Sequence, residues 1–152
     1  MMNTKPSMLI LGIGNPLRGD DGIGVHICAQ LEQLNIPHIS VQTTHQLHTE
    51  WIYTFRQYDV VLLVDASLSD QEVAIRPIAP TPVSSVNLSH HVAASQIAAL
   101  ASLIVGSTTL FFECAVPGDA FGLSDQLSEK GRIYADLAVK SIIGWLDDFP
   151  PS

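Results

Sequence analysis

Two adjacent carboxylates near the start of the chain are the residues best suited to chemistry. Asp20 and Asp21 stand in a glycine-rich run that follows the apolar stretch Met8–Leu11. Glycine permits positive φ angles and lets another chain or a ligand come close to the backbone. An ionised carboxylate beside a low-dielectric wall needs a cation or hydrogen-bond donors to stabilise it. We therefore expect a cation or donor site here, with one of the two aspartates capping the helix that follows.

The same run contains part of a dinucleotide-binding pattern. Gly12 and Gly14 follow a predicted strand, as the first two glycines of GxGxxG do. The position of the third glycine holds Leu17, and Asp20 and Asp21 would repel a phosphate. The chain also lacks a GxxxxGK(S/T) sequence. A nucleotide-binding α/β domain is therefore the least favoured of the functions we consider.

Further polar side chains follow the other predicted strands. His45 comes after the second strand, Asp65 ends the third, and His90 and His91 begin an alanine-rich helix. Ligands of open parallel sheets bind at the carboxyl ends of the strands, where these residues would meet. Carboxylates and imidazole together suit a borderline divalent metal. Taken singly, each residue is equally explained as a turn, capping or solvent-exposed residue.

Strand and helix patterns alternate along the chain. Apolar runs predict strands at 8–11, 39–43, 60–64, 72–78 and 109–115, and helical spacing predicts helices at 23–34, about 50–55, 92–105 and from Ser124 to about Asp148. Val60–Val64 is typical of a strand buried on both faces, whereas Pro77 places its strand at an edge. This order predicts one domain over residues 1–152, a three-layer α/β/α sandwich with a mostly parallel five-stranded sheet.

The composition limits which binding partners and which cellular compartment are expected for this protein. The net charge of −8 argues against nucleic acid and anionic membranes as partners. No apolar run is long enough for a membrane span, and the first residues lack the layout of a signal peptide. Cys28 and Cys114 are isolated thiols in apolar surroundings, as in proteins of a reducing cytosol. We expect a cytoplasmic protein that is a monomer.

The opening run resembles the signature of a known family. Its residues Gly12-x-Gly14-Asn15-Pro16-Leu17-x-x-Asp20-Asp21-Gly22-x-Gly24 match the hydrogenase maturation proteases, small endopeptidases that trim the C-terminus of the [NiFe] hydrogenase large subunit once nickel is installed. The resemblance covers nearly the whole chain, through Val64-Asp65-Ala66, Ser89-His90 and the turn from Pro117 to Gly122-Leu123-Ser124. Thr44-His45-Gln46-Leu47 is similar to the variant in the subgroup that serves bidirectional, NAD-linked hydrogenases.

The resemblance implies a metal-reading site. By position in the motifs, the metal ligands and catalytic residues fall on Asp21, Asp65 and His90, or on His91 in place of His90 if the spacing slips. The chain has no HExxH sequence, and no resident metal is expected. The nickel belongs to the partner, the large-subunit precursor, and serves as the recognition element.

The identity of the group that cleaves the peptide bond stays open at this point. Nickel polarising a carbonyl or a water, with a carboxylate as base, is one route. Serine chemistry is not indicated because GxSxG is absent, and neither cysteine has an evident activating base. The same three ligands would also serve a non-cleaving metal-sensing or chaperone module for the same subunit.

Overall fold

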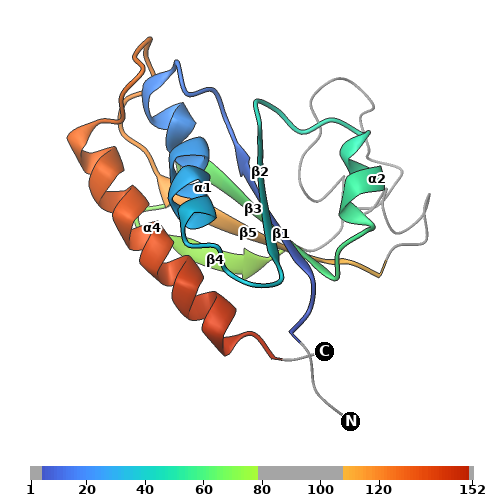
Figure 1. Ribbon diagram of the computed structural model, residues 1–152. Helices are drawn as coiled ribbons and strands as arrows, with labels where there is room; N and C mark the ends of the chain where they lie inside the picture. Colours follow the sequence, from blue (N-terminus) through green and yellow to red (C-terminus); the bar gives the residue numbers. More distant parts are fainter. Residues whose placement is uncertain (1–4, 79–107, 151–152) are drawn as a thin grey trace.

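Five strands form the centre of the molecule. The computed structural model describes residues 5–78 and 108–150 (Figure 1). The strands are β1 (Met8–Ile13), β2 (Ile39–Thr44), β3 (Val60–Ser67), β4 (Ala74–Pro77) and β5 (Leu110–Pro117). They lie in the order β2-β1-β3-β5-β4, and all neighbours are parallel except β4 and β5, which are antiparallel. The predicted mostly parallel five-stranded sheet is confirmed, including the edge position of the strand that contains Pro77.

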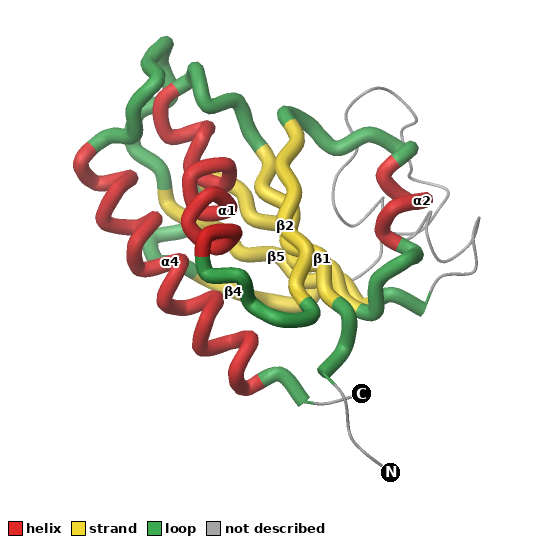
Figure 2. Tube along the Cα trace, viewed as in Figure 1, coloured by secondary structure: helices red, strands yellow, loops and turns green. Residues whose placement is uncertain are grey.

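Helices pack on both faces of this sheet. A short 3-10 helix, η1 (Gly19–Gly22), leads into α1 (Ile23–Gln33), and α1 lies beside the long C-terminal helix α4 (Glu129–Asp148) on one face (Figures 1 and 2). The short helix α2 (Trp51–Phe55) lies on the opposite face. The helix predicted for 92–105 falls outside the described residues.

The alternation of side chains along the strands explains the two faces. Successive strand residues point to opposite sides of a sheet. On β3, Leu62 and Val64 join the cluster under α1 and α4, whereas Val61 and Leu63 join the cluster with α2. The apolar run Val60–Val64 is therefore buried on both sides, as its composition predicts. Asp65, the next residue, lies on the same face as Leu63.

The ends of two helices differ from the sequence prediction. The last helix begins at Glu129 with Ser128 as its cap, because the Ser128 hydroxyl accepts from the Gly131 N–H. Ser124 instead closes a local turn with Gln126. Leu34, at the end of the predicted helix 23–34, is 51% exposed because α1 ends there, with the next residue in the left-handed region. Among the described residues, no helix is long and apolar enough to cross a membrane.

Candidate active site

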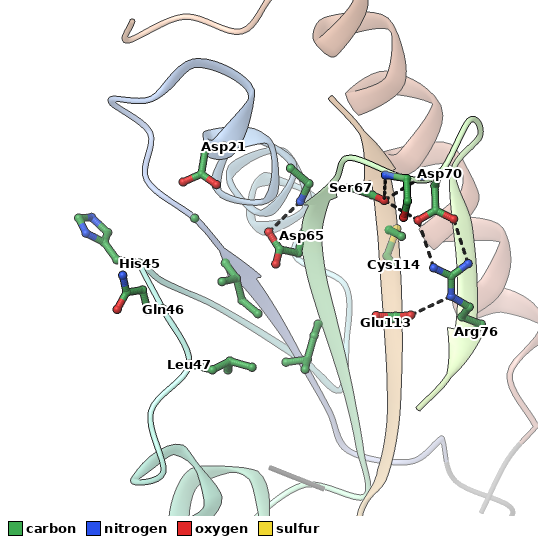
Figure 3. A pocket seen from close by; sticks show the side chains of 16 residues that line it. Asp21, His45, Gln46, Leu47, Asp65, Ser67, Asp70, Arg76, Glu113 and Cys114 are labelled. Atoms are coloured by element: carbon green, nitrogen blue, oxygen red, sulfur yellow. Dashed lines mark hydrogen bonds and ion pairs between the residues drawn. The ribbon is translucent and has the colours of Figure 1, made fainter. Parts of the chain in front are cut away.

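A cavity of about 570 Å³ opens at the carboxyl end of the parallel strands (Figure 3). Residues of β1, β3, β4, β5, η1 and the β2–α2 connection line it. Its ionisable side chains are Asp21, His45, Asp65, Asp70, Arg76, Glu113 and Cys114. The edge of the sheet that the sequence indicated therefore carries a cavity, and Asp21 and Asp65 both line it, as expected.

Asp65 is the central carboxylate of this cavity. It is exposed to the cavity, and the backbone N–H of Ala66 donates to its Oδ1 at 2.8 Å. The surrounding protein removes water from its other sides and raises the pKa of Asp65 to about 7, against the effect of the Ala66 hydrogen bond. The neighbouring charges of Asp21 and Glu113 raise it further. Asp65 is thus poised to exchange a proton near neutral pH.

Asp21 approaches the cavity from η1 and is partly buried. The backbone N–H of Asn15 donates to its Oδ2 at 2.8 Å. Gly14 is required beside it, because Gly14 has φ +141° and a Cβ atom there would overlap the carbonyl oxygen of Asp21. The glycine-rich run therefore lets two segments of this chain come close together. Because Asp21 occupies the space beside Gly14, no phosphate-binding turn is left open there.

Asp20, the neighbour of Asp21, is fully buried and points away from the cavity lining. Its Oδ2 accepts from the N–H groups of Asp119 and Ala120 at 2.8 and 3.0 Å and from the Ser128 hydroxyl at 2.6 Å. Its Oδ1 accepts from the Ser128 N–H at 2.8 Å. Burial alone would raise the pKa of Asp20, but these four hydrogen bonds outweigh it and lower the pKa.

The prediction that one of the two aspartates caps the following helix is wrong. The cap residue of α1 is Gly22, which has no side chain to accept a hydrogen bond. Asp20 contacts the first turn of α4 instead, where a negative charge also interacts favourably with the helix dipole. Its partners lie about a hundred residues further along the chain, so no local pattern could have indicated them.

The wall of the cavity beside β4 is an ion-pair network that the sequence analysis missed. Arg76 Nη1 and Nη2 each donate to one carboxylate oxygen of Asp70 at 3.1 Å, and Arg76 Nε donates to Glu113 Oε1 at 2.8 Å (Figure 3). The Arg76 hydrogen bonds, followed by that of the Ser67 hydroxyl, lower the pKa of Asp70. Arg76 is opposite Glu113 only because β4 pairs with β5 in this register.

The remaining candidates divide clearly. His45 lines the cavity, whereas His90 and His91 lie outside the described residues. Burial raises the pKa values of the Cys28 and Cys114 thiols to about 12, so neither is an activated nucleophile. Within residues 5–78 and 108–150, no three His, Cys, Asp or Glu side chains are grouped so as to hold a metal ion.

The fold is shared with solved structures of one functional class. No family model matches the sequence, and neither does any curated protein. The [NiFe] hydrogenase maturation protease HycI from Thermococcus kodakarensis KOD1 is 23% identical, with 94% of each chain covered and a TM-score of 0.69. The hydrogenase maturating endopeptidase HybD from Escherichia coli is 19% identical, with 93% of this chain and 92% of that chain covered and a TM-score of 0.71. The [NiFe] hydrogenase maturation protease HybD from Thermococcus kodakarensis is 18% identical over 91% of this chain and 98% of that chain, with a TM-score of 0.68. Over nearly its whole length, this chain has the fold of the [NiFe] hydrogenase maturation proteases.

Proposed function

We propose that this protein is an endopeptidase that removes the C-terminal extension of a [NiFe] hydrogenase large subunit after nickel insertion. The observation that carries the proposal is that Asp21 and Asp65, from separate motifs, line one cavity at the carboxyl end of the sheet. The shared fold supports the same reaction class. The acting species is a cytoplasmic monomer in this proposal, and its partner is the large-subunit precursor.

The proposed role of the two aspartates is to read the substrate's nickel. Carboxylate oxygens are ligands for a divalent metal, and His90 would supply a nitrogen from the segment between β4 and β5. Two carboxylates and one imidazole leave coordination positions open, which suits docking onto a metal that the substrate already holds. A subunit without nickel would lack this anchor, so cleavage would await metal insertion.

Hydrolysis also needs a group that takes a proton from the attacking water. The water oxygen bonds to the carbonyl carbon of the scissile peptide, the C–N bond breaks, and the leaving nitrogen receives a proton. In the metal-free protein Asp65 has a pKa of about 7, which suits this transfer near neutral pH. A bound divalent metal would lower that pKa, so Asp65 can serve as this base only while it is not itself bound to the nickel. Asp70 and Glu113 are less suited to take this proton, because both carboxylates already form ion pairs with Arg76.

The decisive experiment is incubation with the unprocessed, nickel-loaded large subunit, followed by mass spectrometry of its C-terminus. We expect a single cut that removes the extension, and no cut in a subunit made without nickel. Treating the protease alone with chelator, then removing the chelator, should leave the rate unchanged. Binding of the loaded subunit without trimming would identify a metal-sensing or chaperone module instead. Efficient trimming of nickel-free substrate would overturn the proofreading role.

Direct metal binding tests the proposed ligands separately. Ni²⁺ should bind the free protein weakly, and more weakly as the pH falls through the histidine range near about 6.5, because protons compete for imidazole. Calorimetry should show the loss of this binding in His90→Ala. His26→Ala is the matched control, since His26 is exposed and bonds Gln30. Binding that survives His90→Ala would move the assignment to His91 or His45.

The subgroup is proposed from one short segment. Thr44-His45-Gln46-Leu47 places His45 on the cavity and buries Leu47 in the cluster with α2. We assign the substrate to the bidirectional, NAD-linked hydrogenases on this basis. Trimming rates on large subunits of that class and of another class, measured side by side, test the assignment, and equal rates would remove it.

A further inference from the structure

We propose that Asp20 is the positioning residue of the site, holding Asp21 at the cavity by fastening η1 to the connection between β5 and α4. This inference rests on the proposed function for its kinetic part only. Asp20 itself does not line the cavity, so it would act through the backbone of η1.

The first step is that η1 is joined to the β5–α4 connection by backbone as well as side-chain bonds. The Gly19 N–H donates to Ser124 O at 2.9 Å, the Asp20 N–H donates to Ala120 O at 2.8 Å, and the Ser124 N–H donates to Leu17 O at 3.0 Å. Gly19 has φ +58°, and a Cβ atom there would lie 2.5 Å from Ala120 O. The two segments are therefore in direct contact, with no room for a larger residue between them.

The second step is that the buried carboxylate of Asp20 adds side-chain hydrogen bonds to this contact between η1 and the β5–α4 connection. Its four hydrogen bonds reach both ends of the connection, at Asp119 and Ala120 after β5 and at Ser128 before α4. A Cβ atom on Gly131 would overlap Asp20 Oδ1, so the first turn of α4 is shaped to admit the carboxylate. Removing the carboxylate would leave three backbone N–H groups without the acceptor they now have.

The third step is that Asp21 occupies the other side of the same short helix. The Asp21 carboxylate bonds Asn15 N, and its backbone carbonyl rests against Gly14. η1 is thus held between Gly14–Asn15 and the β5–α4 connection. A shift of η1 away from the connection would carry Asp21 with it, because Asp20 and Asp21 are consecutive in one helical turn.

An amide cannot replace this carboxylate. Asparagine offers one acceptor oxygen, and its NH₂ group would face at least one donor that now meets an oxygen. Asp20→Asn therefore keeps the volume of the side chain while loosening the contact. Ser128→Ala is a second variant that leaves the three backbone bonds to Asp20. It removes the hydroxyl that donates to Asp20 and that also caps α4 by accepting from the Gly131 N–H.

Two measurements test the proposal. In single-turnover trimming assays, Asp20→Asn should lower the maximal rate by about tenfold or more, because misplacing a reacting group by about 1 Å has large effects. It should also raise the substrate concentration at half-maximal rate, because Asp21 is a proposed ligand of the substrate's nickel. By nuclear magnetic resonance, the Asn15 amide, which reports its bond to Asp21, should shift and exchange with solvent faster. Ser128→Ala should give the same changes to a smaller extent.

Two controls separate positioning from general destabilisation. Ile142→Val or Ile142→Ala, whichever matches the loss of Tm, removes buried volume from α4 far from η1 and should leave both readouts unchanged. Ser124→Ala is the control for Ser128→Ala, since the Ser124 hydroxyl lies in the same connection and, within the described residues, bonds only the backbone of Gln126. If the wild-type protein trims no substrate, the proposed function fails. The NMR signal of the Asn15 amide would still test whether Asp20 holds Asp21 in place. An unchanged Asn15 amide, or an unchanged maximal rate, in folded Asp20→Asn would overturn the inference.

Discussion

Asp20 and Asp65 are carboxylates with opposite environments and opposite acidity. Asp20 is fully buried, yet its pKa is lowered, whereas Asp65 is open to a cavity and its pKa is raised to about 7. The difference follows the number of donors. Four hydrogen bonds stabilise the charge of Asp20, while Asp65 has one, from its neighbouring N–H, and faces two other carboxylates. The comparison teaches that a buried carboxylate with several hydrogen-bond donors keeps its charge, whereas a carboxylate with one donor and nearby negative charges holds its proton up to a higher pH.

Removing the carboxylates of the cavity should have the largest effect on activity and only a small effect on stability. We expect Asp65→Ala or Asp21→Ala to abolish trimming of the nickel-loaded subunit, because each removes a proposed oxygen ligand. The free energy of unfolding should change by about 1 kcal/mol or less, since neither side chain fills the core. Mass spectrometry and thermal melts measure the two effects. Normal trimming by either variant would remove that residue from the site.

Removing the charge of Asp20 should have the largest effect on stability. Asp20→Asn should lower the free energy of unfolding by about 1–3 kcal/mol, because a buried donor loses its acceptor. The folded pKa is lowered, so the stabilisation by wild-type Asp20 is present above the unfolded value of about 3.9 and is lost as the pH falls below it. Urea titrations should show a constant difference at about neutral pH that narrows in acid. A difference that widened in acid would contradict the assignment of donors.

Neutralising Asp65 should stabilise the free protein. Its folded pKa lies above the unfolded value, so wild type loses stability as the pH rises from about 4 to about 7. Asp65→Asn avoids this loss and should be more stable by about 1 kcal/mol at about pH 8, because solvent in the cavity screens most of the effect. Melts across pH check this, and the gain should vanish in acid. Equal melting curves at every pH would place Asp65 in an ordinary solvated environment.

The Arg76 network should matter least to stability, although Arg76 donates three hydrogen bonds to Asp70 and Glu113. The Arg76 side chain is 46% exposed, whereas Asp20 is buried. We expect Arg76→Ala to lower the free energy of unfolding less than Asp20→Asn does, and by still less at high salt. Urea titrations at two salt concentrations measure this. If Arg76→Ala lowered the free energy of unfolding as much as Asp20→Asn does, the number of hydrogen bonds would determine the stabilisation regardless of solvent exposure.

Local sequence pattern predicted the sheet and the two aspartates that line the cavity. Runs such as Val60–Val64 predict strands because burial on both faces demands continuous apolar residues. The rule that parallel strands gather ligands at their carboxyl ends predicted that both Asp20 and Asp21 would lie near Asp65, and only the family resemblance favoured Asp21. Asp21 and Asp65 both line the cavity, and Asp20 does not. The third predicted ligand, His90, remains a prediction because it lies outside the described residues.

Tertiary structure decided the structural half of the site. The sequence presents Asp20 and Asp21 as equivalent neighbours, but the donors at Asp119, Ala120 and Ser128 come from the far end of the chain and select only one of them. Arg76 meets Glu113 only through the register of β4 and β5. Apolar periodicity is a property of neighbouring residues and is therefore readable from sequence. Which buried charge is satisfied depends on donors supplied by distant segments, and only the folded chain brings them together.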